Sequence, residues 1–249
     1  MTDPWFPHRK ATRNASVRLF CFPYAAKGAS TYRSYADRLP AHIEVCAVQL
    51  PGREERLADP PLTSMQDLVE AVADAIGPYL DLPFAFYGQS MGAIVAFEVA
   101  RALRARQSVA PEHLFVAREQ APHLLVPAAL TNDRLSDDEL LRDTRRAPLD
   151  SPLRANPEVL ELMLPTYRAD SLVLERYRYV RAEPLECPIT AFVPQEDNTL
   201  SRQDVEAWHA HTSAAFRLEV LPGRGWELFG PEGEAAMCEA MVDELTFVT

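Results

Sequence analysis

The fold of this chain is decided by residues 84–98, which read FAFYGQSMGAIVAFE. Five mostly apolar residues predict a buried strand, the sequence GQSMG predicts a sharp turn, and the small residues that follow predict a helix. A G-x-S-x-G sequence between a strand and a helix is typical of a nucleophile elbow, in which glycines leave room where the two elements come close. Ser90 is then raised to the carboxyl edge of a sheet, beside a helix N-terminus that favours negative charge. The alternative is a Gly-Ser-Gly loop without a chemical role.

Strands and helices alternate on both sides of this stretch. The apolar patterns predict strands at 17–22, 43–50, 84–88, 113–117, 189–193 and 216–221, and helices at 32–39, 64–79, 202–212 and 232–245. This alternation predicts one α/β domain over residues 1–249, with a mainly parallel sheet and helices on both of its faces.

The pattern changes between about Asp133 and Arg181. Charged helical patterns alternate there with prolines, among them Pro157 and Pro165, and no strand pattern occurs. A helical insertion of this length between two strands predicts a lid over the site at the sheet edge.

Composition excludes several classes of function. The chain has 25 basic and 36 acidic residues, a formal net charge of −11, which argues against nucleic acid as a partner because phosphate binding needs a basic surface. No apolar stretch of about 18 residues predicts a membrane span, and residues 1–16 lack the apolar core of a secretory signal, so we expect a cytoplasmic protein. The four cysteines are far apart in apolar runs, which predicts core packing. The sequence implies neither a metal nor a soluble cofactor.

A nucleophilic Ser90 needs a base, an acid that orients the base, and donors for the oxyanion. The Met91 backbone N–H and an N–H near Ala25 are expected to supply the donors. Asp197 follows a predicted strand and is the candidate acid, although it also suits an ordinary turn. In α/β-hydrolases the base is a histidine after the acid, yet the loop at 222–229 reads PGRGWELF and no histidine follows His211.

The six histidines offer no convincing substitute. His209 and His211 belong to a predicted helix before the last strand and are expected to be exposed. The others are expected to be structural or to lie away from the carboxyl edge, namely His8, His42, His113 and His123.

The chain resembles the type II thioesterases of polyketide and nonribosomal peptide assembly lines over nearly its whole length. The segments that carry the resemblance are 22–25, 28–30, 48–54, 88–92, 121–123, 164–165, 168–170 and 206–208. The resemblance implies an α/β-hydrolase fold with a helical lid. It also implies a Ser-Asp-His triad and hydrolysis of acyl groups from the phosphopantetheine arm of an acyl carrier protein. By position, Ser90 matches the nucleophile and Asp197 the acid.

Four departures from the family pattern lie in loops near the expected site. The position of the family's histidine falls on Gly225, and Gln89 replaces the usual histidine of the elbow. The segment 26–28 replaces a triple glycine, and 118–120 stands where the family tends to have a glycine and arginines. Because general base help typically contributes about 10²–10⁴-fold, efficient hydrolysis by the usual route is not expected.

New charge enters the same loops, which suggests a different polar site. Glu119 or Glu227 is a candidate acid/base, and Lys27 or Arg224 a candidate to hold an anion or enolate; the other candidate substrate-binding residues are Gln89 and Trp226. The alternative is that the long side chains point to solvent.

The leading hypothesis is a type II thioesterase-like enzyme with non-standard catalysis. One alternative is the same fold repurposed for a non-hydrolytic step, such as cyclisation, elimination or acyl transfer. Another is a non-catalytic protein that binds an acyl chain or a carrier.

Overall fold

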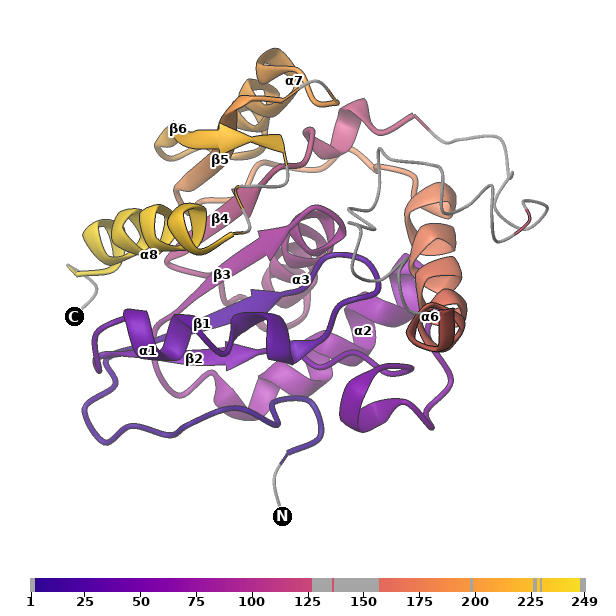
Figure 1. Ribbon diagram of the computed structural model, residues 1–249. Coiled ribbons are helices and arrows are strands. Elements are labelled where there is room, and N and C mark those ends of the chain that lie inside the picture. Colours follow the sequence, from indigo (N-terminus) through magenta and orange to yellow (C-terminus); the bar gives the residue numbers. More distant parts are fainter. Residues whose placement is uncertain are drawn as a thin grey trace.

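The computed structural model describes residues 3–126, 136, 157–197, 199–225, 228 and 230–246. Its centre is a six-stranded sheet in the order β2-β1-β3-β4-β5-β6, with every pair of neighbours parallel (Figure 1). The strands are β1 (Val17–Phe22), β2 (Ile43–Ala47), β3 (Phe84–Gln89), β4 (His113–Ala117), β5 (Ile189–Glu196) and β6 (Phe216–Arg224). The predicted parallel sheet is therefore confirmed.

Helices cover both faces of the sheet (Figure 1). The α-helices are α1 (Tyr35–Arg38), α2 (Met65–Ile76), α3 (Met91–Gln107), α6 (Pro157–Arg176), α7 (Arg202–Glu206) and α8 (Pro231–Leu245). Short 3-10 helices occupy Ala29–Tyr32, Glu54–Arg56, Gly77–Tyr79, Pro122–Leu124 and Ala207–His211. Helices α1 and α8 pack together on one face, and α2 and α3 pack together on the other.

Successive strand residues point to opposite faces and build two cores. On β1, Phe20 joins the core beneath α2 and α3, whereas Leu19 and Cys21 join the core beneath α1 and α8. Because both faces are covered, β1 to β4 are buried along their whole length and read mostly as apolar runs, whereas the edge strand β6 alternates polar and apolar residues. All four cysteines are buried and unbridged, as their apolar surroundings predicted.

The last two strands are longer than the sequence indicated. β5 and β6 continue to Glu196 and Arg224, which pair with each other beyond an irregularity between Pro194 and Glu196. Residues 222–224 were expected in a loop because they begin with Pro222. β6 is an edge strand, however, where a proline can face away from the ladder.

Helix α6 makes up most of the described part of the segment expected to form a lid; residues 133–135 and 137–156 lie outside the described residues. It lies beside α2 (Figure 1), and its Thr166 hydroxyl donates to the Gly52 carbonyl at 2.5 Å. The helix continues through Pro165. No helix among the described residues is long and apolar enough to cross a membrane.

The N-terminus of α3 packs directly against the ends of β1 and β3. A Cβ atom at Gly92 would lie 2.1 Å from the Phe22 carbonyl oxygen, and one at Gly88 would lie 2.3 Å from the Gly92 carbonyl oxygen. No side chain fits between these backbones, which is why glycines flank Ser90.

Gly92→Ala should therefore lower the free energy of unfolding by about 3 kcal/mol, because the added methyl group forces backbones apart. The matched control is Gly77→Ala, since Gly77 has helical angles and nothing within 4 Å of an added Cβ. Urea unfolding should show the control to be neutral or up to about 1 kcal/mol more stable. Equal stability of the two variants would contradict the packing described.

Candidate active site

Ser90 occupies a strained turn between β3 and α3. Its φ of 47° and ψ of −119° are rare for a residue with a side chain, and such strain clusters at functional sites. The Ser90 N–H donates to the Ala117 carbonyl at 2.9 Å, and the Ser90 carbonyl accepts from the Ala93 N–H at 2.8 Å. This is the geometry of the nucleophile elbow that the sequence predicted.

Glu119 brings a carboxylate close to Ser90. Its Oε2 lies 3.4 Å from Ser90 Oγ, and its Oε1 accepts from the Gln120 N–H at 3.1 Å. The Glu119 carbonyl accepts from Trp208 Nε1 at 2.9 Å, which ties this segment to the 3-10 helix before β6. Of the two acid/base candidates from the sequence, Glu119 is at Ser90, and Glu227 lies outside the described residues.

Asp197 directly follows β5, where its partners are Arg118 and Thr199. Arg118 Nε lies 2.7 Å from Asp197 Oδ2, and both side chains are at most 4% exposed. Asp197 Oδ1 also accepts from the N–H and hydroxyl of Thr199 at 2.8 and 2.7 Å. Burial raises the pKa of Asp197, but the Thr199 hydrogen bonds and the Arg118 charge outweigh it, so the net pKa is below its ordinary value. The ionised carboxylate is therefore stabilised by Thr199 and by the Arg118 charge.

The loop after β1 is tied down on the other side of Ser90. The Ala26 N–H donates to Asp170 Oδ2 at 2.7 Å, and Arg53 holds both Asp170 oxygens at 2.7 and 2.8 Å. Arg53 and Asp170 are buried. Gly92 abuts the carbonyls of residues 22 and 23, so this loop starts at the N-terminus of α3. That arrangement agrees with the expected pairing of the Ala25 and Met91 N–H groups as oxyanion donors.

Two further candidates, Gln89 and Arg224, have their side-chain partners away from Ser90. The buried Gln89 side chain donates to the hydroxyls of Tyr87 and Tyr35 on the α1 and α8 face. Arg224 is largely exposed and lies 3.0 Å from Glu196, because β6 extends through it and pairs with β5. Lys27 is half-buried, and burial lowers its pKa. The nearby charge of Glu54 raises the pKa by a smaller amount, so the net shift is downward. Trp226 lies outside the described residues.

A cavity of about 300 Å³ opens at Ser90. Ser90 and Glu119 contribute its polar part, and Leu124, Leu125, Leu174 and Leu200 contribute apolar wall. Larger hollows of about 680 and 610 Å³ lie elsewhere on the protein and border none of the candidate residues. We therefore identify the candidate site by the reactive side chains that meet in this cavity, not by the size of the cavity.

All six histidines lie in the described part of the chain, and none lines this cavity. His209 is exposed, as expected. The expectation for His211 was wrong, because this side chain is buried against Phe97 and Trp208. Its Nε2 lies 2.7 Å from His123 Nδ1, so tertiary packing pairs two histidines away from Ser90.

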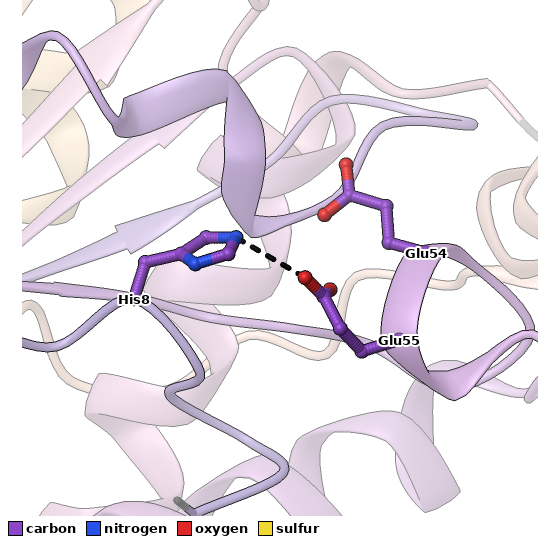
Figure 2. A group of neighbouring side chains, drawn as sticks. All are labelled: His8, Glu54 and Glu55. Carbon is purple, nitrogen blue, oxygen red and sulfur yellow. Dashed lines mark ion pairs between the residues drawn. The ribbon is translucent and has the colours of Figure 1, made fainter.

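One group of side chains among the described residues has metal-like spacing, namely His8, Glu54 and Glu55 (Figure 2). His8 Nε2 lies 3.5 Å from Glu55 Oε1 and 3.1 Å from Nη2 of Arg33, so a guanidinium already provides the cation. Glu54 accepts from the Ser30 N–H at 3.1 Å. These contacts explain the group as a surface hydrogen-bond and ion-pair network, and we assign no metal to it.

Sheet order, elbow and site together define an α/β-hydrolase fold. The chain belongs to the thioesterase family, because the family model for the thioesterase domain matches residues 17–245.

Two relatives are similar to this chain over most of its length. The gramicidin S biosynthesis protein GrsT of Aneurinibacillus migulanus is 41% identical, over 99% of this chain and 95% of that protein. Thioesterase PikA5 of Streptomyces venezuelae is 36% identical, over 88% of this chain and 78% of that protein.

Two solved structures are similar along almost their full length. RedJ, the thioesterase from the prodiginine pathway of Streptomyces coelicolor, superposes with a TM-score of 0.84 at 37% identity, over 96% of this chain and 98% of RedJ. BorB, the type II thioesterase from the borrelidin cluster, superposes with a TM-score of 0.85 at 30% identity, over 98% and 99% of the two chains.

Two residues important to the site were missed as candidates by sequence reasoning. Arg118 had a signal, since it follows a predicted strand and opens the segment 118–120, which was expected to depart from the family pattern. In the structure it adopts a left-handed φ of 49°. Asp170 lay within a resembling segment, but its contact with Arg53 spans 117 positions, which no local pattern shows.

Asp170→Asn should lower the free energy of unfolding by about 3–5 kcal/mol, because it leaves the buried Arg53 charge without its partner. The matched control is Glu206→Gln, which removes one partner of an exposed ion pair with Arg202 and should cost under about 1 kcal/mol. Chemical denaturation measures both. A loss for Asp170→Asn no larger than the control's would contradict the role of this pair.

Stability should fall as pH falls from about 6.5 to 4, partly through His211. Burial lowers the pKa of His211 to about 4, with the nearby His123 and Arg101 charges adding to the effect. The unfolded chain therefore binds a proton in this range that the folded protein does not. In urea unfolding, His211→Asn should flatten the dependence of stability on pH, and the exposed-site control His209→Asn should not. A wild-type slope in His211→Asn would contradict this assignment.

Proposed function

We propose that this protein is a type II thioesterase-like enzyme of polyketide or nonribosomal peptide biosynthesis. In this proposal it hydrolyses acyl groups from the phosphopantetheine arm of a carrier protein, with Ser90 as nucleophile and Glu119 as base. Family membership and the named relatives support the substrate class. The observation that carries the mechanism is the 3.4 Å approach of the Glu119 carboxylate to Ser90 Oγ in a part-buried site. Catalytic hydrogen bonds are often long without substrate and shorten in the complex.

The first half-reaction transfers the acyl group to Ser90. Glu119 takes the Oγ proton while Oγ bonds to the thioester carbon, and the oxyanion is held by the Met91 and Ala25 N–H groups. The carbon–sulfur bond then breaks, and the protonated Glu119 gives its proton to the departing thiolate. In the second half-reaction, Glu119 takes a proton from water as the water oxygen bonds to the ester carbon. The bond from that carbon to Ser90 Oγ then breaks, and Glu119 returns the proton to Oγ, which releases a carboxylic acid and restores both residues.

The same proposal accounts for a chain in which the position of the family's histidine falls on Gly225. A carboxylate is a weaker base than an imidazole, whose ordinary pKa is about 6.5 against about 4.3 for glutamate. A thioester, however, is more electrophilic than an amide, so its hydrolysis demands less from the base. The enzyme is therefore expected to be slower than a thioesterase with a complete triad.

Ser90→Ala and Glu119→Gln should each reduce hydrolysis of a short acyl N-acetylcysteamine thioester by about 10²-fold or more, because each removes one member of a coupled pair. Thiol release measures the rate, and the same acyl group on a phosphopantetheinylated carrier tests the natural form of the substrate. The matched control is Glu196→Gln, an exposed carboxylate at the same sheet edge, which should retain wild-type activity.

The outcomes separate this proposal from its alternatives. A carboxylate base also predicts that hydrolysis persists below pH 6.5, where an imidazole base would be protonated. Unchanged hydrolysis in Glu119→Gln would overturn the assignment of the base. No hydrolysis in the wild type, with consumption of substrate to another product, would favour a non-hydrolytic step. Binding without any conversion would favour a non-catalytic protein.

A further inference from the structure

The Arg118 guanidinium lies within van der Waals distance of the position that a Cβ at residue 225 would take. Gly225 has a φ of +50°, and the atom within 4 Å of a Cβ built on it is Arg118 Nη2, at 3.9 Å. The same guanidinium lies against Asp197, with Nε 2.7 Å from Oδ2 and Nη2 3.3 Å from Oδ1. A base carried by residue 225 would have to reach Asp197 through this position.

The backbone of Arg118 also determines where Glu119 lies. The Arg118 N–H donates to the Phe192 carbonyl at 3.0 Å, which keeps the end of β4 on β5. The left-handed φ of 49° then turns the chain, and the next residue reaches Ser90. A left-handed arginine is strained, so the contacts of its side chain must hold it there.

We propose that Arg118 is a positioning residue: its buried ion pair with Asp197 fixes the turn that holds the Glu119 carboxylate at Ser90. Asp197, the expected triad acid, thereby orients the base through an arginine and the backbone instead of through a histidine. This inference rests on the proposed role of Glu119. It assigns a function to a pair that would otherwise only fill the space near Gly225.

Three contacts make the Arg118 side chain suited to this task. Its Nε and Nη2 reach the two oxygens of Asp197, and Nη2 also donates to Thr199 Oγ1 at 2.6 Å. A guanidinium presents several donors in one plane, so it fixes orientation as well as charge. Burial lowers the pKa of Arg118 while the charges of Asp197 and Glu119 oppose that shift, so the cation also acts on the proposed base. A nearby cation favours the ionised form of a carboxylate, which is the form that a base requires.

The deciding variant is Arg118→Gln/Asp197→Asn, which removes both charges together and leaves no unpaired ion. Its kcat for the thioester should fall about tenfold or more with KM changed less than about twofold, because a misplaced base affects the chemical step. The acid limb of its pH profile should move to higher pH. The matched control, Arg106→Gln/Asp74→Asn, removes an exposed ion pair and should change none of these values.

A second readout does not depend on thioester turnover. A fluorophosphonate reacts with an activated serine: a bond forms between Oγ and phosphorus, fluoride leaves, and the base takes the serine proton. The rate of Ser90 labelling should fall about tenfold in the double variant. Arg118→Lys keeps the positive charge but lacks the planar set of donors of the guanidinium, so we expect a labelling rate between those of the wild type and the double variant. It also decides the question if the double variant does not fold, because wild-type rates in Arg118→Lys would contradict orientation by the guanidinium.

The two proposals fail in different ways. Wild-type kcat, labelling rate and pH profile in a folded Arg118→Gln/Asp197→Asn variant would overturn the positioning role, even if Glu119→Gln is inactive. If neither the wild type nor any variant hydrolyses a thioester, the proposed substrate is wrong. The positioning role still stands in that case if the rate of Ser90 labelling depends on Arg118 and Glu119.

Placing a histidine at residue 225, with and without Arg118, tests whether the two side chains compete for the same approach to Asp197. Gly225→His alone should gain little activity, because Arg118 already occupies the approach to Asp197. Arg118→Gly/Gly225→His should exceed that single variant by about tenfold or more and no longer need Glu119. The control is Arg118→Gly/Gly225→Asn. Asparagine tolerates the left-handed φ at position 225 but cannot act as a base. A full gain in Gly225→His alone would contradict the proposed occupation of this space.

Discussion

The site depends on the close approach of the α3 N-terminus to the end of β1. Gly92 lies against the Phe22 carbonyl so tightly that no Cβ fits, and Gly88 lies equally close to Gly92. This contact forces Ser90 into its left-handed angle and brings the loop after β1 beside the first N–H groups of α3. The nucleophile and the expected oxyanion donors thus follow from one packing constraint.

Two buried ion pairs then fix the flanks of Ser90. Arg53 and Asp170 hold the loop that contains Ala26, and Arg118 and Asp197 hold the turn before Glu119. Burying such charges is costly, and the cost is offset where donors and acceptors match closely, as the two hydrogen bonds from Arg53 to Asp170 do. The site is therefore built from charged groups where a Ser-His-Asp triad would place an imidazole. A carboxylate base fits an environment that already contains a fixed cation.

The sequence predicted the fold well because the fold is carried by local patterns. The bounds of β1 and β4 were predicted exactly, and the serine between its two glycines stands where the motif placed it. Glu119 was a candidate and lies at Ser90. The contact between Arg118 and Asp197 was not predicted, since it joins residues 79 positions apart. Arg224 was expected in a loop near the site, but pairing of the sheet edge directs it to Glu196, and tertiary packing buries His211.

The central claim is that Ser90 carries the acyl group and Glu119 transfers its protons. Mass spectrometry of the protein, quenched milliseconds to minutes after mixing with an acyl thioester, tests this directly. The account predicts an acyl adduct on the peptide containing Ser90, which forms more slowly and also decays more slowly in Glu119→Gln, because the base serves both half-reactions. Turnover without any adduct on Ser90, or an adduct whose formation and decay are unchanged in Glu119→Gln, would contradict it.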